Sequence, residues 1–235
     1  VVNKKRYLIC NNEIEWKNVK LLLENISMDE YTRLKDEFVQ RKFFKMKNHT
    51  NEKKLLNLPM IDRRNEQYIN LLENNWQDRY YNVLFNAKAI RNNDVLKNIC
   101  INYIEGLEWT FNYYTKGCID WKWTYKYNYA PLLKDLYVYI PYFNTSLFNV
   151  SEIKKYNDVS PYTQLAYVLP KSGLHLFPNA IKTMLLSKYK HMYDDHQLIW
   201  VFCRYFWESK IVFPEIRLDD LEKDINQIEK DLNII

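Results

Sequence analysis

Two pairs of adjacent aspartates, Asp194–Asp195 and Asp219–Asp220, are the residues with the clearest potential for metal chemistry. A magnesium-dependent hydrolase needs several carboxylates that converge on one or two ions. Adjacent side chains diverge on a helix or a strand, so the first pair, with two histidines nearby, indicates a solvated loop. The second pair begins an expected helix and compensates its dipole. Glycine-rich phosphate loops and Gly-x-Ser-x-Gly elbows are also missing, so the sequence predicts no complete catalytic site.

A second group of residues has the chemistry of nucleic-acid contact. Between residues 118 and 131, aromatic side chains alternate with polar ones at Trp121, Trp123, Tyr125, Tyr127 and Tyr129. A period of two predicts an extended segment rather than a helix. Rings on such a segment can stack on unpaired bases, which stabilises binding by about 1–3 kcal/mol per base.

Lysines around this aromatic segment point to the same chemistry. Lys116, Lys122 and Lys126 lie close enough in the sequence to meet phosphates. The net charge of +5 and the pI of about 8.8 permit contact with an anionic polymer without requiring it. The alternative is that the rings build core and fix a loop against helices. For the segment as a whole, this structural interpretation is the favoured one.

The elements that must position these residues are predicted to be helices. The 235 residues are 47% hydrophobic, which is enough to bury a core, and include only 3 glycines and 7 prolines. All-β folds need more frequent turns. Apolar residues spaced by three and four predict helices over 16–26, 31–38, 69–84 and 93–117. A capping box at Ser27–Glu30 separates the first two helices, and Gly117 is a natural C-terminal cap.

The remaining segments complete an all-α prediction. Residues 48–62 are polar, contain Pro59 and predict a loop. Residues 218–235 carry an a/d heptad pattern, for which a helix docked on the domain is favoured over a coiled-coil partner. No repeat or low-complexity linker is visible. We therefore expect a single helical domain over 1–235, with a long aromatic loop and at most minor strands.

The cysteine pattern bears on the compartment. Cys10, Cys100, Cys118 and Cys203 are widely spaced and form no CxxC pair, which indicates free thiols rather than zinc ligands or disulfides. No signal peptide is visible, and no apolar run approaches the roughly 20 residues that cross a bilayer. We expect an intracellular protein, cytoplasmic or nuclear, without membrane contact. The first residue, Val1, suggests a fragment or a processed product.

A longer motif surrounds the aromatic segment. It runs from Tyr103-Ile104-Glu105-Gly106-Leu107-Glu108-Trp109 through Tyr113-Tyr114 and Lys116-Gly117 to the stretch between Trp121 and Pro131. This block resembles the second conserved region of the XRN family of 5'-to-3' exoribonucleases. Further segments resemble the family in the same order, at residues 76–81, 164–170 and 206–216. The similarity therefore covers most of residues 12–225.

Three positions depart from the family's pattern. Lys126 stands where the family has proline, Asn128 where it has histidine, and Asp120 where it has serine. These departures suggest a divergent branch, with a viral source among the candidates. They bear on fine contacts rather than on the fold.

The resemblance implies the helical, non-catalytic part of a nuclease. In the family, the Mg²⁺ carboxylates and the 5'-phosphate pocket belong to the first conserved region, and we find no counterpart of that region in this sequence. The second region packs against the first and helps to wall the RNA channel. The implied partners are single-stranded RNA and the catalytic N-terminal region of the same or a companion chain. No cofactor is expected in this chain, which should be an inactive hydrolase fragment by itself.

The resemblance also assigns a role to one tryptophan. A family tryptophan similar in position to Trp109 lies near the 5' end of the RNA and helps to hold stacked bases, so we give Trp109 this role over a buried core role. A stand-alone module that binds RNA or protein, and a purely structural domain, are the alternatives. No catalytic or metal-binding residue is predicted. The predicted RNA-binding residues are Trp109, Tyr113, Lys116, Trp121, Trp123 and Tyr127.

Overall fold

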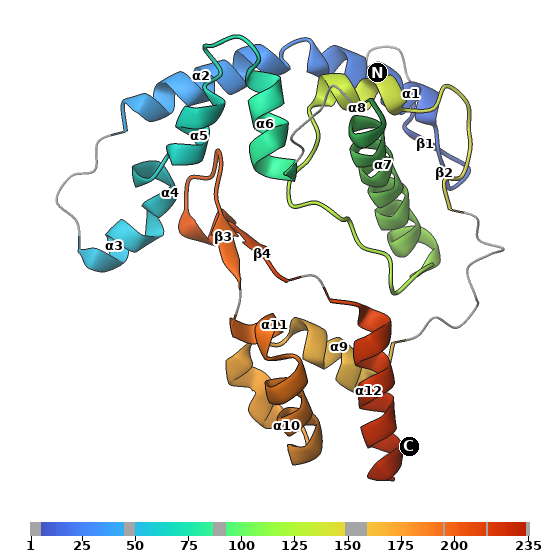
Figure 1. Cartoon of the computed structure of the whole chain (residues 1–235). Helices are drawn as coiled ribbons and strands as arrows, with labels where there is room; N and C mark the ends of the chain where they lie inside the picture. Colours follow the sequence, from blue (N-terminus) through green and yellow to red (C-terminus); the bar gives the residue numbers. More distant parts are fainter. Residues whose placement is uncertain are drawn as a thin grey trace. The chain divides into compact units, whose positions relative to one another are not determined.

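The computed structural model confirms the all-α fold (Figure 1). It describes residues 6–44, 50–86, 93–148, 159–194, 196–214 and 216–233. Within these ranges the strands form only two small two-stranded sheets. In the same part of the chain, no helix combines the length and the apolarity needed to cross a membrane. The four cysteines are free thiols, as predicted.

The chain divides into two compact units. Unit 1 comprises residues 1–119, 124–150 and 200–210, and unit 2 comprises 120–123, 151–199 and 211–235. The expectation of a single domain stays a prediction. The helices of unit 1 are α1 (Trp16–Ser27), α2 (Glu30–Lys42), α3 (Asn51–Leu56), α4 (Leu58–Ile61), α5 (Arg64–Ile69), α6 (Trp76–Phe85), α7 (Asn93–Lys116), α8 (Leu133–Tyr139) and the 3-10 turn η3 (Phe206–Glu208).

Unit 1 opens with a β-hairpin. Strands β1 (Ile9–Cys10) and β2 (Glu13–Ile14) pair antiparallel. Asn11 and Asn12 between them have φ angles of 50° and 58°. Two successive residues with positive φ form the turn whose twist matches paired strands, and asparagine tolerates that conformation better than most residues.

The longest predicted helix is confirmed. α7 runs from Asn93 to Lys116 (green in Figure 1), and Gly117 follows it with a φ of +92°. Only glycine adopts that conformation without a steric cost from Cβ, so the helix stops there. The buried face of α7 includes Cys100 and Ile104, which pack with Trp16 of α1 and Leu136 of α8.

Two sequence predictions in unit 1 are wrong. The stretch 48–62 is not a loop, because α3 and α4 occupy most of it: the Thr50 side chain accepts a hydrogen bond from the Lys53 backbone N–H, and Pro59 stands in the first turn of α4, where a missing N–H is harmless. The predicted helix over 69–84 starts too early, because Ile69 is the last residue of α5, residues 70–75 form a turn, and α6 begins only at Trp76. Asn70 and Asn75 adopt left-handed conformations between α5 and α6, which turns the chain.

The predicted boundary between α1 and α2 is confirmed, but its capping box is not. No side chain caps the start of α2. Glu30 instead reaches helix α8, where its carboxylate accepts hydrogen bonds from the backbone N–H groups of Leu133 at 2.6 Å and Lys134 at 3.2 Å. Burial raises the pKa of Glu30. The two hydrogen bonds oppose this effect of burial, and they let the Glu30 carboxylate cap the N-terminal end of a helix about one hundred residues away.

The opposite end of α8 is held by a lysine from α1. The Lys20 ammonium donates to the carbonyl oxygens of Tyr137 at 2.8 Å and Ile140 at 2.9 Å, and it lies 4.0 Å from the ring centroid of Tyr142. Lys20 is buried, and desolvation lowers its pKa. α8 has only seven residues. Both of its ends are thus capped by charges from other helices.

Unit 2 has its own hydrophobic core. The prediction of a docked C-terminal helix is confirmed, because Leu221 and Ile225 of α12 are fully buried against residues such as Ile181 and Leu185. Its elements are α9 (Pro161–Val168), η2 (Lys171–Leu176), α10 (Asn179–Lys188), α11 (Lys190–Asp194), β3 (Gln197–Ile199), β4 (Lys210–Val212, whose first residue counts with unit 1) and α12 (Leu218–Asp231).

Candidate functional site

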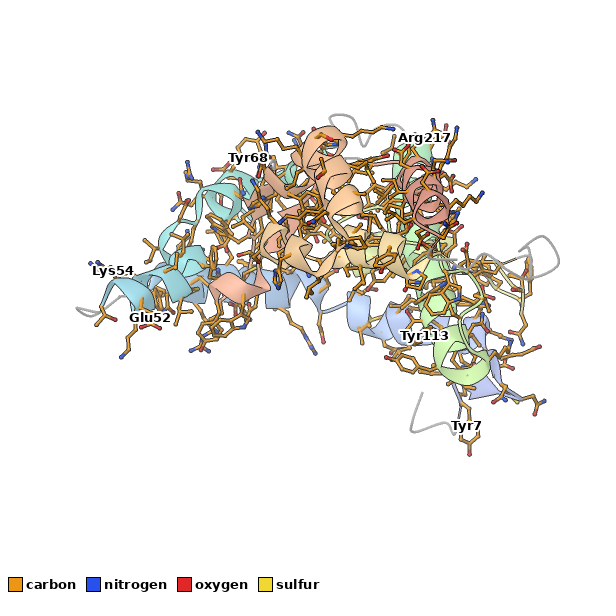
Figure 2. All side chains as sticks on the ribbon, turned by 90° about the horizontal axis from the view of Figure 1, so that it is seen from below. Tyr7, Glu52, Lys54, Tyr68, Tyr113 and Arg217 are labelled. Atoms are coloured by element: carbon orange, nitrogen blue, oxygen red, sulfur yellow. The ribbon has the colours of Figure 1, made fainter. Side chains whose placement is uncertain are left out.

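Two aromatic rings stack on each other near the C-terminal end of α7. Trp109 and Tyr113 are four residues apart, so they project from the same face of the helix. Their ring centroids are 5.3 Å apart and their planes differ by 17°. Trp109 is half-buried and Tyr113 is 42% exposed. Figure 2 labels Tyr113 on α7. The pair therefore offers a supported aromatic surface that solvent can reach.

Other residues of the same part of α7 line a small polar pocket in unit 1. It has a volume of about 220 Å³ and is lined by Lys116, Glu108 and Asn112, among others. The buried Glu108 carboxylate accepts hydrogen bonds from the Ser146 hydroxyl and the Leu147 backbone N–H, both at 2.7 Å. Lys116 is exposed, so its ammonium is available at the end of α7.

Tyr127 lies in a different aromatic cluster from Trp109. Its ring packs against Phe85 of α6 at 5.5 Å and against Tyr125 at 5.6 Å, and burial raises its pKa. The hydroxyl of Tyr80 donates to the carbonyl of Ala130 at 3.0 Å. These contacts fix the segment against α6, which is the structural interpretation of the aromatic alternation.

The alternation itself is visible in the burial of the segment. From residue 123 to residue 129, the odd-numbered aromatic side chains are partly buried and the even-numbered residues between them are exposed. The segment is neither helix nor strand, so it is non-helical as predicted. Within unit 1, the rings of Tyr125 and Tyr127 join the aromatic cluster.

Two of the predicted residues, Trp121 and Trp123, belong to unit 2. Trp121 is 51% exposed and Trp123 is half-buried. Between them, the Lys122 ammonium contacts the carboxylates of Asp219 at 2.8 Å and Glu222 at 2.7 Å, and these hydrogen bonds raise its pKa. Lys122 is therefore neutralised by α12, contrary to its predicted role at a phosphate.

Candidate metal ligands do not gather among the residues that the structure describes. No group of three histidine, cysteine, aspartate or glutamate side chains is placed to hold an ion there. Asp194 pairs with Lys171 at 2.6 Å and with Lys190 at 3.8 Å, and the hydrogen bond from Lys171 lowers its pKa. Asp195 lies outside the described residues.

Sequence reasoning missed a second exposed stack in unit 1. The guanidinium of Arg204 lies 5.3 Å from the ring centroid of Tyr205, whose ring stacks on Trp207 at 4.4 Å with planes 17° apart. No regular spacing in the sequence marks this stack, because Tyr205 is extended while Phe206 and Trp207 belong to the 3-10 turn η3.

Comparison with known proteins identifies the family. The family described as the Xrn1 helical domain matches residues 29–234. The chain is 27% identical over 163 residues to 5'-3' exoribonuclease 2 of Arabidopsis thaliana, which covers 67% of this chain and 15% of the relative. It is 31% identical over 122 residues to 5'-3' exoribonuclease 2 of Saccharomyces cerevisiae, which covers 51% of this chain and 11% of the relative.

A third relative, 5'-3' exoribonuclease 2 of Eremothecium gossypii, is 28% identical over 130 residues, which covers 54% of this chain and 13% of the relative. The chain thus spans only a small part of the length of the curated relatives it matches. These relatives come from a plant and two fungi, and a viral source stays a prediction. Because the family match extends over most of the sequence, this chain belongs to the Xrn1 helical domain family.

Proposed function

We propose that this chain is the helical, non-catalytic part of a 5'-to-3' exoribonuclease, and that it helps to wall the RNA channel and to hold the 5' end of single-stranded RNA. The stacked Trp109–Tyr113 pair carries this proposal. It sits on a long helix, its outer ring is accessible, and Lys116 follows one turn later with an exposed ammonium. Stacking and phosphate attraction bind unpaired strands of any sequence.

Hydrolysis in the complete enzyme requires groups beyond these residues. Two-metal phosphodiester cleavage needs converging carboxylates, which we assign to a catalytic N-terminal region in the same or a companion chain. The Mg²⁺ ions belong there, and we assign no cofactor to this chain. The four free thiols support a reducing intracellular setting, cytoplasmic or nuclear.

Replacing Trp109 tests the proposed RNA contact. In the complete enzyme that our proposal requires, Trp109→Ala should lower kcat/KM on 5'-phosphorylated single-stranded RNA by roughly tenfold, because a stacked base loses about 1–3 kcal/mol of binding. Trp109→Phe should retain most of the activity, since it keeps an aromatic face. Processive degradation and thermal unfolding are measured on the same preparations.

The matched control is Leu107→Ala, which truncates another partly exposed apolar side chain on α7. It should leave the rate per folded molecule unchanged. If Trp109→Ala lowers the melting temperature sharply while the folded fraction keeps its full specific activity, Trp109 is a core residue and the proposal is wrong.

The chain by itself should have no nuclease activity. Purified protein incubated with Mg²⁺ and 5'-phosphorylated RNA should leave the RNA intact, because a lone helical part cannot supply a two-ion site. Gel electrophoresis of the labelled RNA measures this. Degradation that EDTA abolishes, and that persists through successive purification steps, would contradict the non-catalytic assignment.

A further inference from the structure

A buried ion cluster anchors the loop that follows Trp200 in unit 1. The Glu66 carboxylate, from α5, accepts hydrogen bonds from Arg41 at 2.6 and 3.1 Å and from Arg63 at 2.6 Å. It also accepts the Phe202 backbone N–H at 2.9 Å, and Arg41 donates to the Cys203 carbonyl at 2.6 Å. Buried charges are costly unless fully paired, so this cluster holds the start of the loop in one position.

The backbone of the loop is strained at Phe202, the residue whose N–H is bound by the ion cluster. Phe202 has a φ of 55°, a conformation that a bulky non-glycine residue rarely adopts. Strain of this kind persists only where the surroundings impose it, and it is found preferentially where a protein must present a particular shape. The strained backbone leads directly into the exposed stack of Arg204, Tyr205 and Trp207.

The inward side of the loop is packed, which leaves the stack facing solvent. Phe206 turns toward Trp200, with ring centroids 6.4 Å apart, and the Trp200 indole N–H donates to the Asp62 carbonyl at 2.8 Å. The Arg204 backbone N–H donates to the Glu208 carboxylate at 2.8 Å. Trp207 remains 65% exposed. The packed base thus presents two nearly parallel rings, with the Arg204 guanidinium near Tyr205 and an accessible indole at Trp207.

The surroundings of the stack are cationic. Lys53 and Lys54 lie on α3, which contacts η3, and Lys210 follows the loop. All three are exposed, and within the described residues none of them forms an ion pair. Figure 2 shows Lys54 at the outer side of α3, with the acidic Glu52 nearby. These three lysines and Arg204 outnumber the acidic residues Glu52 and Glu208. The resulting net positive charge suits a polyanion better than an acidic or neutral protein surface.

We propose that the stack of Arg204, Tyr205 and Trp207 is a platform for one unpaired base of a single-stranded RNA, distinct from the Trp109–Tyr113 pair. A base would extend the stack on the indole face while neighbouring phosphates meet the lysines. Every base has a π-face, so this contact is tolerant of sequence. The inference rests on the proposed function for the identity of the ligand, and it adds a second contact along the strand.

The test measures binding of a fluorescein-labelled, 5'-phosphorylated single-stranded RNA to the whole chain by fluorescence anisotropy. Trp207→Ala should weaken binding about tenfold, and Trp207→Phe should restore most of the affinity. Tyr7→Ala is the matched control. Tyr7 is a 72% exposed aromatic residue that Figure 2 places at the other end of unit 1 from α3, and its loss should have no effect.

A second RNA of the same length with abasic sites separates stacking from charge. It keeps the phosphates and lacks the bases, so Trp207→Ala should bind it as tightly as the unchanged chain does. Equal weakening on both RNAs would overturn the platform. Circular dichroism of each variant confirms folding, and Trp207→Phe keeps the test decisive if the alanine variant unfolds.

The remaining outcomes separate this inference from the proposed function. If Trp109→Ala weakens RNA binding and Trp207→Ala does not, the platform is refuted and the proposed function stands. If the unchanged chain binds no RNA, both fail. If Trp207→Ala weakens association with the catalytic region but not with RNA, the stack is a protein interface and the platform is refuted.

Discussion

Glu66→Gln is expected to lower the free energy of unfolding by about 3–5 kcal/mol. The Glu66 side chain is 1% exposed and lies between the guanidinium groups of Arg41 and Arg63. Glutamine has nearly the same shape, but it is neutral and replaces one acceptor oxygen with a donor. Two buried positive charges would then lack their shared counter-ion. Urea-induced unfolding monitored by circular dichroism gives the free-energy difference.

Glu37→Gln is a close control for this substitution. Glu37 also pairs with Arg41, at 3.5 Å, but its side chain is 52% exposed. Exposed ion pairs contribute roughly 0–1 kcal/mol, so this variant should remain close to the unchanged protein. A Glu66→Gln protein as stable as the Glu37→Gln protein would show that water or rearrangement compensates the buried arginines, against our interpretation of the cluster.

Lys20→Met should have the second largest effect, a loss of about 2–4 kcal/mol. Methionine keeps much of the apolar stem of lysine. It cannot donate to the carbonyl oxygens of Tyr137 and Ile140, which the Lys20 ammonium contacts at 2.8 and 2.9 Å. These buried acceptors at the end of α8 would lose a charged donor. Thermal and chemical unfolding are the measurements.

The control for Lys20 is Lys17→Met, an exposed lysine one turn earlier on α1. It should change stability by less than about 0.5 kcal/mol. Equal losses in the two variants would mean that helix propensity or net charge, rather than the cap on α8, accounts for the effect.

The parts of the fold that local physics determines could be predicted from the sequence. α7 was predicted within a residue or so at both ends, because its apolar spacing is regular and Gly117 ends it. α12 followed from its heptad pattern. The short helices α3 and α4 were missed because they bury little apolar surface and therefore leave no strong periodicity.

Features that depend on distant contacts could not be predicted in this way. Glu30 carried a correct local signal for a helix boundary, yet its carboxylate serves a helix 103 residues later. Arg41 and the Cys203 carbonyl are 162 residues apart. For the candidate site, the sequence named Trp109 and Tyr113 separately as RNA-binding residues, but it did not predict that their rings stack on each other. The sequence favoured packed rings for the aromatic segment, but it could not name Phe85 as the partner of Tyr127 or show that α12 neutralises Lys122.

The double capping of α8 also has a kinetic consequence. A helix of seven residues is too short to persist by itself in water, since nucleation costs more than so few backbone hydrogen bonds return. α8 can become stable only after α1 and α2 have delivered Lys20 and Glu30 to its ends. It therefore belongs to the late steps of folding, in which contacts between remote stretches close. Its amide protons should exchange with solvent only when the whole of unit 1 opens, whereas a helix with local caps frays alone.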